Sequence, residues 1–393
     1  MIRILHVLGK LDRGGVETWL VQVLRNIDRK KYQMDFMVHT TDPGAHDEEV
    51  RALGARIIPC EGVSNPLQYA SSFRRIARDN SPYDVVHSHV HHFSGYVLML
   101  AALAGVKVRI AHSHTSAPEY SAGLPRCAYL AVMRHLIKRY TTVGITVSRL
   151  AGDSLMSGWE TDNRWHLMPY GLEIEPFGIR ANSVALRKEL GLPPEAAVVG
   201  HVGRFVDAKN HNLIVSVASE LIKLRPNVSF LLIGDGPMRL AIETNLRNSG
   251  LTDRFVLTGT RDDIPMLMKS AMDVFLFPSK YEGLGIVLME AQLAGLCSVV
   301  SDVIPVEADL TNDAVSRLPL SAQPRQWAEA LNAILEARSH CIVSDDVRKQ
   351  RSISESVLQL TNLDDSACQQ TRTVGENEKK LTLTNKNEDL CAP

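Results

Sequence analysis

The chain has 393 residues, which is long enough for two domains with separate hydrophobic cores. Its hydrophobic content of 45% and charged content of 22% are those of an ordinary globular protein, and the formal net charge of −1 argues against a general nucleic-acid binder. The longest apolar stretch, residues 95–106, is too short to span a bilayer. Six cysteines without CxxC pairs, and no signal-peptide pattern at the start, favour a reduced, cytoplasmic location.

The first predicted element is a buried parallel strand over Ile2–Leu8, followed by the loop Gly9–Gly15 and a helix with an apolar stripe. Strand, glycine loop and helix in this order bind nucleotides at the carboxyl edge of many open sheets. The GxGxxG fingerprint is absent, so a dehydrogenase-type dinucleotide site is not expected. Gly14 and Gly15 are candidates for close backbone approach to phosphates or a sugar, although a plain tight turn explains them nearly as well.

Apolar runs alternate with helix-like segments along the rest of the chain, which predicts two doubly wound α/β halves. Further strands are expected at residues 33–39, 56–59, 85–87, 108–111, 145–147 and 165–168 in the first half, and at 197–202, 228–233, 255–258, 274–277, 298–301 and 314–318 in the second. The domains are predicted at residues 1–172 and 173–349, followed by a helix at 350–363 that could cross back to the first domain. The polar composition of residues 364–393 predicts a disordered tail.

Histidines gather after two predicted strands of the first half, in the stretches VVHSHVHH (residues 85–92) and AHSHTS (residues 111–116). Imidazoles are common zinc ligands, so a metal site is one interpretation. No cysteine lies nearby, and the spacing places the histidines on both faces of the strand ends. We therefore expect no metal site here and interpret His89 as a side chain that lines a cleft.

Residues 125–140, PRCAYLAVMRHLIKRY, can form a basic amphipathic helix. Arg134, His135, Lys138 and Arg139 alternate there with aliphatic side chains, a composition typical of helices that lie on anionic lipid. An ordinary surface helix with its apolar face on the core fits the same pattern equally well. Both interpretations remain open.

Two basic residues follow the first strand of the second half, Arg204 in GRF and Lys209 in KNH. A guanidinium fork and an ammonium at one strand end suit the oxygens of a diphosphate. Solvated surface cations are the commoner alternative. The sequence contains no DxD motif, which disfavours a diphosphate bridged by magnesium and leaves these two cations to replace the metal.

The stretch FPSKYEGLGIVLMEAQLAG, residues 277–295, places Glu282 in a loop and Glu290 eight positions later inside a predicted helix. Glycines at the helix start let a ligand approach free N–H groups that favour an anion. Glu290 lies among apolar neighbours, where an unpaired carboxylate is costly, so it needs hydroxyls or a cation. Sugar hydroxyls above a diphosphate would satisfy the arrangement, whereas a helix cap followed by a solvated glutamate is the plain alternative.

With its neighbours, this stretch resembles the signature of the retaining GT-B glycosyltransferases of family 4, also called glycosyl transferases group 1. The similarity is strongest to the bacterial branch that builds capsule, exopolysaccharide and O-antigen chains. RGGVE at residues 13–17 and GRFVDAKNH at residues 203–211 resemble loops of the same family. The resemblance covers roughly Met1 to Leu363 and implies two Rossmann-like doubly wound domains that face each other across a cleft.

The resemblance also implies roles for individual residues. Arg204 and Lys209 would neutralise the diphosphate of the leaving nucleotide, Glu282 would contact the transferred sugar, and Glu290 the ribose. A histidine after a strand of the first domain would reach the donor sugar, and the alignment favours His114 over His112. The remaining donor-binding candidates are Gly14, Gly15, Gly283, Leu284 and Gly285.

The implied activity is transfer of a sugar from a UDP- or GDP-sugar, with UDP favoured, to a hydroxyl of a saccharide or lipid-linked saccharide, with retention at the anomeric carbon. No cofactor, metal or nucleic acid is expected, and the protein could lie peripherally on the inner face of the cell membrane. Two alternatives are a UDP-sugar 2-epimerase with the same architecture and a non-catalytic nucleotide-sugar-binding protein. The second is disfavoured because Arg204, Lys209, Glu282 and Glu290 are all present.

Overall fold

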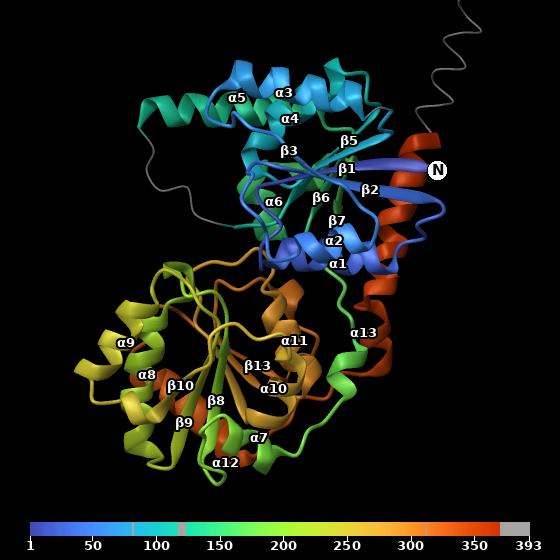
Figure 1. The fold of residues 1–393 in the computed structure, drawn as a ribbon. Helices are drawn as coiled ribbons and strands as arrows, with labels where there is room; N and C mark the ends of the chain where they lie inside the picture. Colours follow the sequence, from blue (N-terminus) through green and yellow to red (C-terminus); the bar gives the residue numbers. More distant parts are fainter. Residues whose placement is uncertain (81, 117–122, 312, 370–393) are drawn as a thin grey trace, which may run out of the picture. The chain divides into compact units, whose positions relative to one another are not determined.

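The computed structural model describes residues 1–80, 82–116, 123–311 and 313–369, and divides the chain into two compact units. Of these residues, the first unit contains 1–114, 123–171 and 353–369, and the second contains 115, 116 and 172–352 apart from 312. Each unit has its own parallel sheet with helices between the strands (Figure 1).

The first unit contains a seven-stranded sheet in the order β3-β2-β1-β4-β5-β6-β7, and every pair of neighbours is parallel. Helices α3, α4 and α5 cover one face of this sheet and α1 and α2 the other (Figure 1). The strands are β1 Ile2–Leu8, β2 Tyr32–Val38, β3 Ile57–Pro59, β4 Val85–Ser88, β5 Val108–Ser113, β6 Val143–Thr146 and β7 Trp165–Leu167. The helices are α1 Gly15–Asn26, α2 Asp47–Ala52, α3 Pro66–Asp79, α4 Ser94–Leu103, α5 Leu124–Tyr140 and α6 Arg149–Leu155.

The second unit contains a six-stranded parallel sheet in the order β10-β9-β8-β11-β12-β13. Its strands are β8 Ala197–Val202, β9 Val228–Ile233, β10 Phe255–Leu257, β11 Val274–Phe277, β12 Ser298–Ser301 and β13 Val315–Leu318. Its helices are α7 Ser183–Glu189, α8 His211–Leu224, α9 Arg239–Asn248, α10 Ile264–Ala271, α11 Ile286–Ala294, α12 Pro324–Ala337 and α13 Asp345–Gln350.

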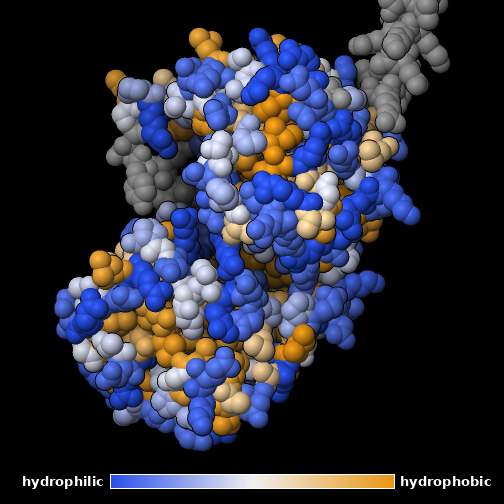
Figure 2. Space-filling model, in the orientation of Figure 1, coloured by the Kyte–Doolittle hydropathy of each residue, from blue (hydrophilic) through white to orange (hydrophobic). Residues whose placement is uncertain are grey.

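Both sheets are covered on two faces, and this explains why their strands read as apolar runs. All six residues of β9 are buried, for example. The thirteen strands lie within two residues of the predicted positions at each end, so the predicted α/β fold is confirmed. On the face that Figure 2 shows, the surface is mostly hydrophilic, with separate apolar patches.

The end of the described chain corrects one prediction. Residues 353–369 are helical and pack on the first unit, where Trp19 Nε1 donates to Ser356 Oγ over 3.2 Å. Lys31 and Tyr32 both bind the Asp365 carboxylate, at 2.6 and 2.8 Å, and Asp364 is buried. A disordered tail that begins at residue 364 is therefore wrong, because residues 364–369 continue the packed helix. The rest of the predicted tail, residues 370–393, lies outside the described residues.

Among the described residues, no helix is both long and apolar enough to cross a membrane.

Candidate active site

The loop after β8 carries the two predicted cations of the second unit. Phe205 is buried within this loop and anchors it, while Arg204 beside it is exposed. Asn210 adopts a left-handed conformation with φ of 55° and donates its side-chain amide to the carbonyl of Pro278, 3.2 Å away. The chain therefore turns sharply before α8, and the loop is attached to the segment that follows β11.

The loop after β11 carries Glu282 and is held against the first loop by further bonds, and Glu290 follows in α11. The backbone N–H of Lys280 donates to the carbonyl of Ala208 over 2.8 Å, and its ammonium pairs with Asp207 at 2.6 Å. Gly285 precedes α11 with φ of 87°, a conformation that L side chains rarely adopt, and Leu284 is buried. Since β8 and β11 are neighbours in the sheet, their carboxyl ends bring both loops together.

Lys209 and Glu282 form an ion pair at the centre of this arrangement. Their side chains are only 17% and 14% exposed, and the Lys209 ammonium lies 5.0 Å from the centre of the Phe277 ring. A cation over an aromatic face gains a further electrostatic contact. The ammonium that is predicted to bind phosphate is thus neutralised by the carboxylate that is predicted to bind the sugar. The guanidinium of Arg204 has no ion-pair or hydrogen-bond partner among the described residues.

Glu290 lies in the second turn of α11 and is half-buried. Burial raises the pKa of its carboxyl group to about 7. No hydrogen-bond or ion-pair partner of this carboxylate is found in the part of the chain that the structure describes. It can accept hydrogen bonds from ligand hydroxyls.

The glycine loop of the first unit has a close partner that the sequence reasoning did not single out. Gly14 caps α1 in an extended conformation, and a Cβ atom there would lie 2.3 Å from Glu17 Oε2. The absence of a side chain at Gly14 gives the Glu17 carboxylate its space. Burial, with the Asp12 charge in addition, raises the pKa of Glu17 to about 7. Gly15 is the first residue of α1 and is exposed.

The two histidine candidates of the first unit occupy different places. His112 is fully buried within β5, and its Nδ1 lies 3.1 Å from His87 Nε2. His114 follows the end of β5, is half-buried, and contacts His89 and the hydroxyl of Tyr170. Burial lowers the pKa of His114 to about 3, so its ring is neutral at physiological pH. Tyr170 was missed because nothing in its local sequence indicates a histidine partner.

The structure thus divides the predicted site residues between the units. Gly14, Gly15 and His114 belong to the first unit, and the other candidates lie in the second, on the two loops and, for Glu290, in α11. The roles assigned to them remain predictions.

Comparison with known proteins identifies the class. Residues 183–351 match the family model of glycosyl transferases group 1, and residues 14–171 match that of the glycosyl transferase 4-like domain. EpsF of Bacillus subtilis strain 168, which is named as a glycosyltransferase, is 36% identical over 334 residues, which are 84% of this chain and 86% of EpsF. The capsular polysaccharide biosynthesis glycosyltransferase CapH of Staphylococcus aureus is 26% identical over 88% of this chain and 94% of its own.

Among solved structures, HepE of Anabaena in complex with UDP and glucose superposes with a TM-score of 0.77 at 18% identity, over 93% of this chain and 100% of HepE. Together with the two parallel sheets, this likeness confirms the predicted GT-B class of fold. The chain belongs to the glycosyl transferases group 1 family and is a glycosyltransferase.

The raised pKa of Glu290 predicts how stability depends on pH. Its folded pKa of about 7 lies above the ordinary value of 4.5, so the native protein binds the proton more tightly than the unfolded chain does. The contribution of this group to stability is present at low pH and is lost as pH rises from 4.5 to 7. Glu290→Gln mimics the protonated form, so the variant should keep this stability as the pH rises. Thermal unfolding of ligand-free protein should give similar midpoints at pH 5 and a higher midpoint for the variant at pH 8.

Glu195→Gln, at an exposed position of the same unit, is the matched control and should follow the wild type at both pH values. An equal difference between Glu290→Gln and the wild type at pH 5 and pH 8 would contradict the buried-carboxyl explanation.

Proposed function

We propose that the protein transfers a sugar from a nucleotide-sugar donor, a UDP-sugar above all, to a hydroxyl of a saccharide or lipid-linked saccharide, with retention, in the biosynthesis of a surface polysaccharide. The observation that carries the proposal is the ion pair of Lys209 and Glu282 between the loops at the carboxyl ends of β8 and β11, with Arg204 on the first loop and Glu290 in the helix after the second. The printed names of EpsF and CapH, and the UDP and glucose bound by HepE, support the substrate class.

The proposed donor contacts follow from the charges in the second unit. Arg204 is available to two phosphate oxygens, and Lys209 can add its charge once the diphosphate replaces Glu282. The first N–H groups of α11, after Gly283 and Gly285, offer further donors to an anion. Glu290 would accept hydrogen bonds from the ribose hydroxyls, and these would supply the partners that its carboxylate does not find among the described residues.

In the proposed reaction, the bond between the anomeric carbon and the diphosphate oxygen breaks, and the acceptor oxygen bonds to the same face of that carbon. The acceptor hydroxyl gives its proton to the departing diphosphate. Arg204 and Lys209 stabilise the charge that grows on this leaving group, while the released Glu282 faces the sugar as it becomes positive. His114 would contact the donor sugar from the first unit.

This account predicts metal-independent transfer. If two cations neutralise the leaving diphosphate, transfer should survive excess EDTA, and Arg204→Ala should lower kcat/KM by roughly 100-fold or more. Arg225→Ala is a control from the same unit, because Arg225 contacts Asn332 outside the two loops. Steady-state kinetics with a panel of UDP- and GDP-sugars, with and without acceptor, provide the measurement.

Activity that is lost in EDTA and restored by magnesium or manganese would contradict this mechanism. Interconversion of epimers, or release of UDP that no acceptor increases, would favour the epimerase alternative over transfer.

A second part of the proposal concerns α5, which we propose as a contact with an anionic membrane surface. Leu124 is 87% exposed and Val132 53% exposed on this helix, whereas Leu130, Met133 and Ile137 are buried against the unit. The helix thus presents apolar side chains to solvent besides those that it packs on the core. Exposed Arg126, Lys138 and Arg139 accompany them, a combination that suits anionic headgroups.

Membrane contact through α5 predicts sedimentation with anionic liposomes at low salt. Each basic residue near such a surface contributes about 1 kcal/mol, so reversal of Lys138 and Arg139 to glutamate should abolish sedimentation. Reversal of the exposed Lys223 and Arg247 in the second unit changes the net charge equally and should leave it intact. If the wild-type protein does not sediment with these vesicles, α5 is an ordinary surface helix.

A further inference from the structure

Five histidines, three of them buried and two half-buried, form a column at the carboxyl ends of three neighbouring strands in the first unit. His6 comes from β1, His87 and His89 from the end of β4, and His112 and His114 from the end of β5. Their rings approach one another with centroids 3.9 to 5.5 Å apart. Burial lowers the pKa of every member, so all five rings are neutral at pH 7.

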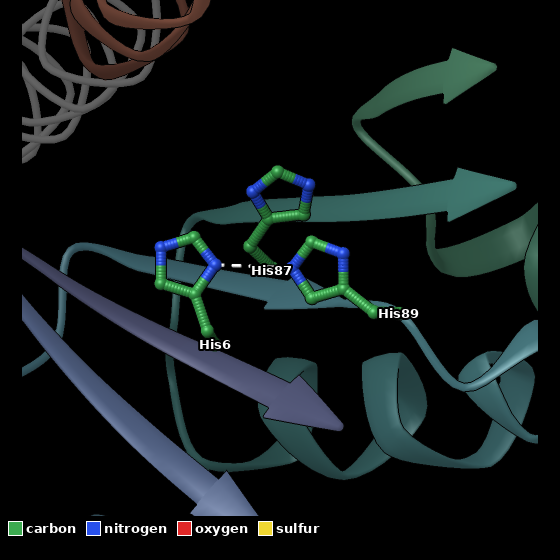
Figure 3. A group of neighbouring side chains, drawn as sticks. All are labelled: His6, His87 and His89. Carbon is green, nitrogen blue, oxygen red and sulfur yellow. Dashed lines mark hydrogen bonds between the residues drawn. The ribbon is translucent and has the colours of Figure 1, made fainter. Parts of the chain in front are cut away.

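The column could be a metal site or a hydrogen-bonded chain, and the distances between the ring nitrogens distinguish the two interpretations. Neutral imidazoles bind metal ions, and His6, His87 and His89 have ligand atoms within 4.8 Å of one another (Figure 3). Two imidazole nitrogens on one tetrahedral zinc, each about 2.0–2.1 Å from the ion, lie about 3.3 Å apart. The observed contacts are 3.0 Å between His6 Nδ1 and His89 Nε2, and 2.7 Å between His89 Nδ1 and His114 Nε2. These are hydrogen-bond distances.

The bonds form a continuous chain from Tyr170 through His114 and His89 to His6. Each neutral imidazole has one N–H donor and one bare acceptor nitrogen, so the direction of one bond fixes the direction of all. Either Tyr170 donates and every proton points toward His6, or His6 Nδ1 donates and every proton points toward Tyr170.

The number of buried hydrogen-bonding groups left without a partner differs between the two directions of the chain. His6 Nε2 is buried without a partner among the described residues, and the Tyr170 hydroxyl has no described partner besides His114. If the protons point toward Tyr170, both the hydroxyl hydrogen and the His6 lone pair are unmatched. If Tyr170 donates, only the N–H of His6 is unmatched. A buried polar group without a partner is destabilising, so the arrangement with one such group is favoured over the arrangement with two.

We infer that Tyr170 and His89 are positioning residues that lock His114 in the neutral tautomer with its proton on Nε2. Tyr170 is fully enclosed, with its ring 5.1 Å from that of Trp19 on α1 and stacked on His114 at 5.7 Å. Nδ1 of His114 then carries no proton. As an acceptor only, this nitrogen can bond to a hydrogen-bond donor such as a hydroxyl group.

The tautomer can be read directly by nitrogen NMR of the full-length protein with ¹⁵N-labelled histidine, in which His114 is assigned from the signals that His114→Gln loses. The wild type should show a protonated Nε2 and a bare Nδ1. Tyr170→Phe removes only the donor and should replace this single tautomer by a mixture. Tyr69→Phe is the matched control, because Tyr69 is a buried tyrosine that bonds His39 Nε2 at 2.9 Å outside the column.

A second pair of variants distinguishes positioning from packing. An asparagine at position 89 places a carbonyl oxygen near the site of His89 Nδ1, so His89→Asn should keep the His114 tautomer and His89→Leu should lose it. A proton on Nδ1 of wild-type His114 would overturn the inference. Metal analysis that finds an equimolar ion bound to the column would overturn it as well.

The consequence for turnover rests on the proposed function. Tyr170→Phe and His89→Leu should lower kcat by about 10-fold with a smaller change in KM, whereas Tyr69→Phe stays near the wild type and His89→Asn loses less kcat than His89→Leu does. If these variants lose the single His114 tautomer but keep the wild-type kcat, Tyr170 and His89 do not position His114 for turnover. If wild-type protein with the expected tautomer transfers no sugar from any donor, the proposed function fails and the tautomer assignment stands.

Discussion

The ion pair between Lys209 and Glu282 organises the charges of the second unit. Both side chains are largely buried, so either charge left alone would lose its hydration without compensation. The pair satisfies both groups, and the Phe277 ring beneath Lys209 gives the ammonium a further contact. In the proposed function, the diphosphate of the donor would take over the role of Glu282 on Lys209. The released carboxylate would then face the position proposed for the sugar, so that one exchange would serve both binding and catalysis.

Much of this fold was predictable because it depends on local composition. Buried parallel strands are apolar along their whole length, which is why runs such as Val228–Ile233 could be recognised without an alignment. The glycines at the start of α11 could also be assigned from the sequence, since Gly285 adopts a backbone conformation that residues with a side chain disfavour. The resemblance of residues 277–295 to a known signature supplied the class of protein, and the family match confirms it.

What the sequence could not show are contacts between residues far apart in the chain. Lys209 and Glu282 are 73 positions apart, and His6 and His89 are 83 apart, so their meeting depends on the order of strands in each sheet. Tyr170 contacts His114 across 56 positions. The early boundary assigned to the tail has a related cause. The composition shows two aspartates after Leu363. It does not show that Lys31 and Tyr32, at the start of the distant strand β2, donate hydrogen bonds to the Asp365 carboxylate.

The exchange of Glu282 for a diphosphate on Lys209 is tested most directly by calorimetric titration of UDP into two variants. Glu282→Gln frees the ammonium and removes a negative charge beside the ligand, so it should bind UDP at least as tightly as the wild type does. Lys209→Met removes a charge-assisted hydrogen bond and should weaken UDP binding by about 10- to 100-fold. If Glu282→Gln instead weakens UDP binding as much as Lys209→Met does, Glu282 is itself a ligand of the nucleotide and the exchange does not occur.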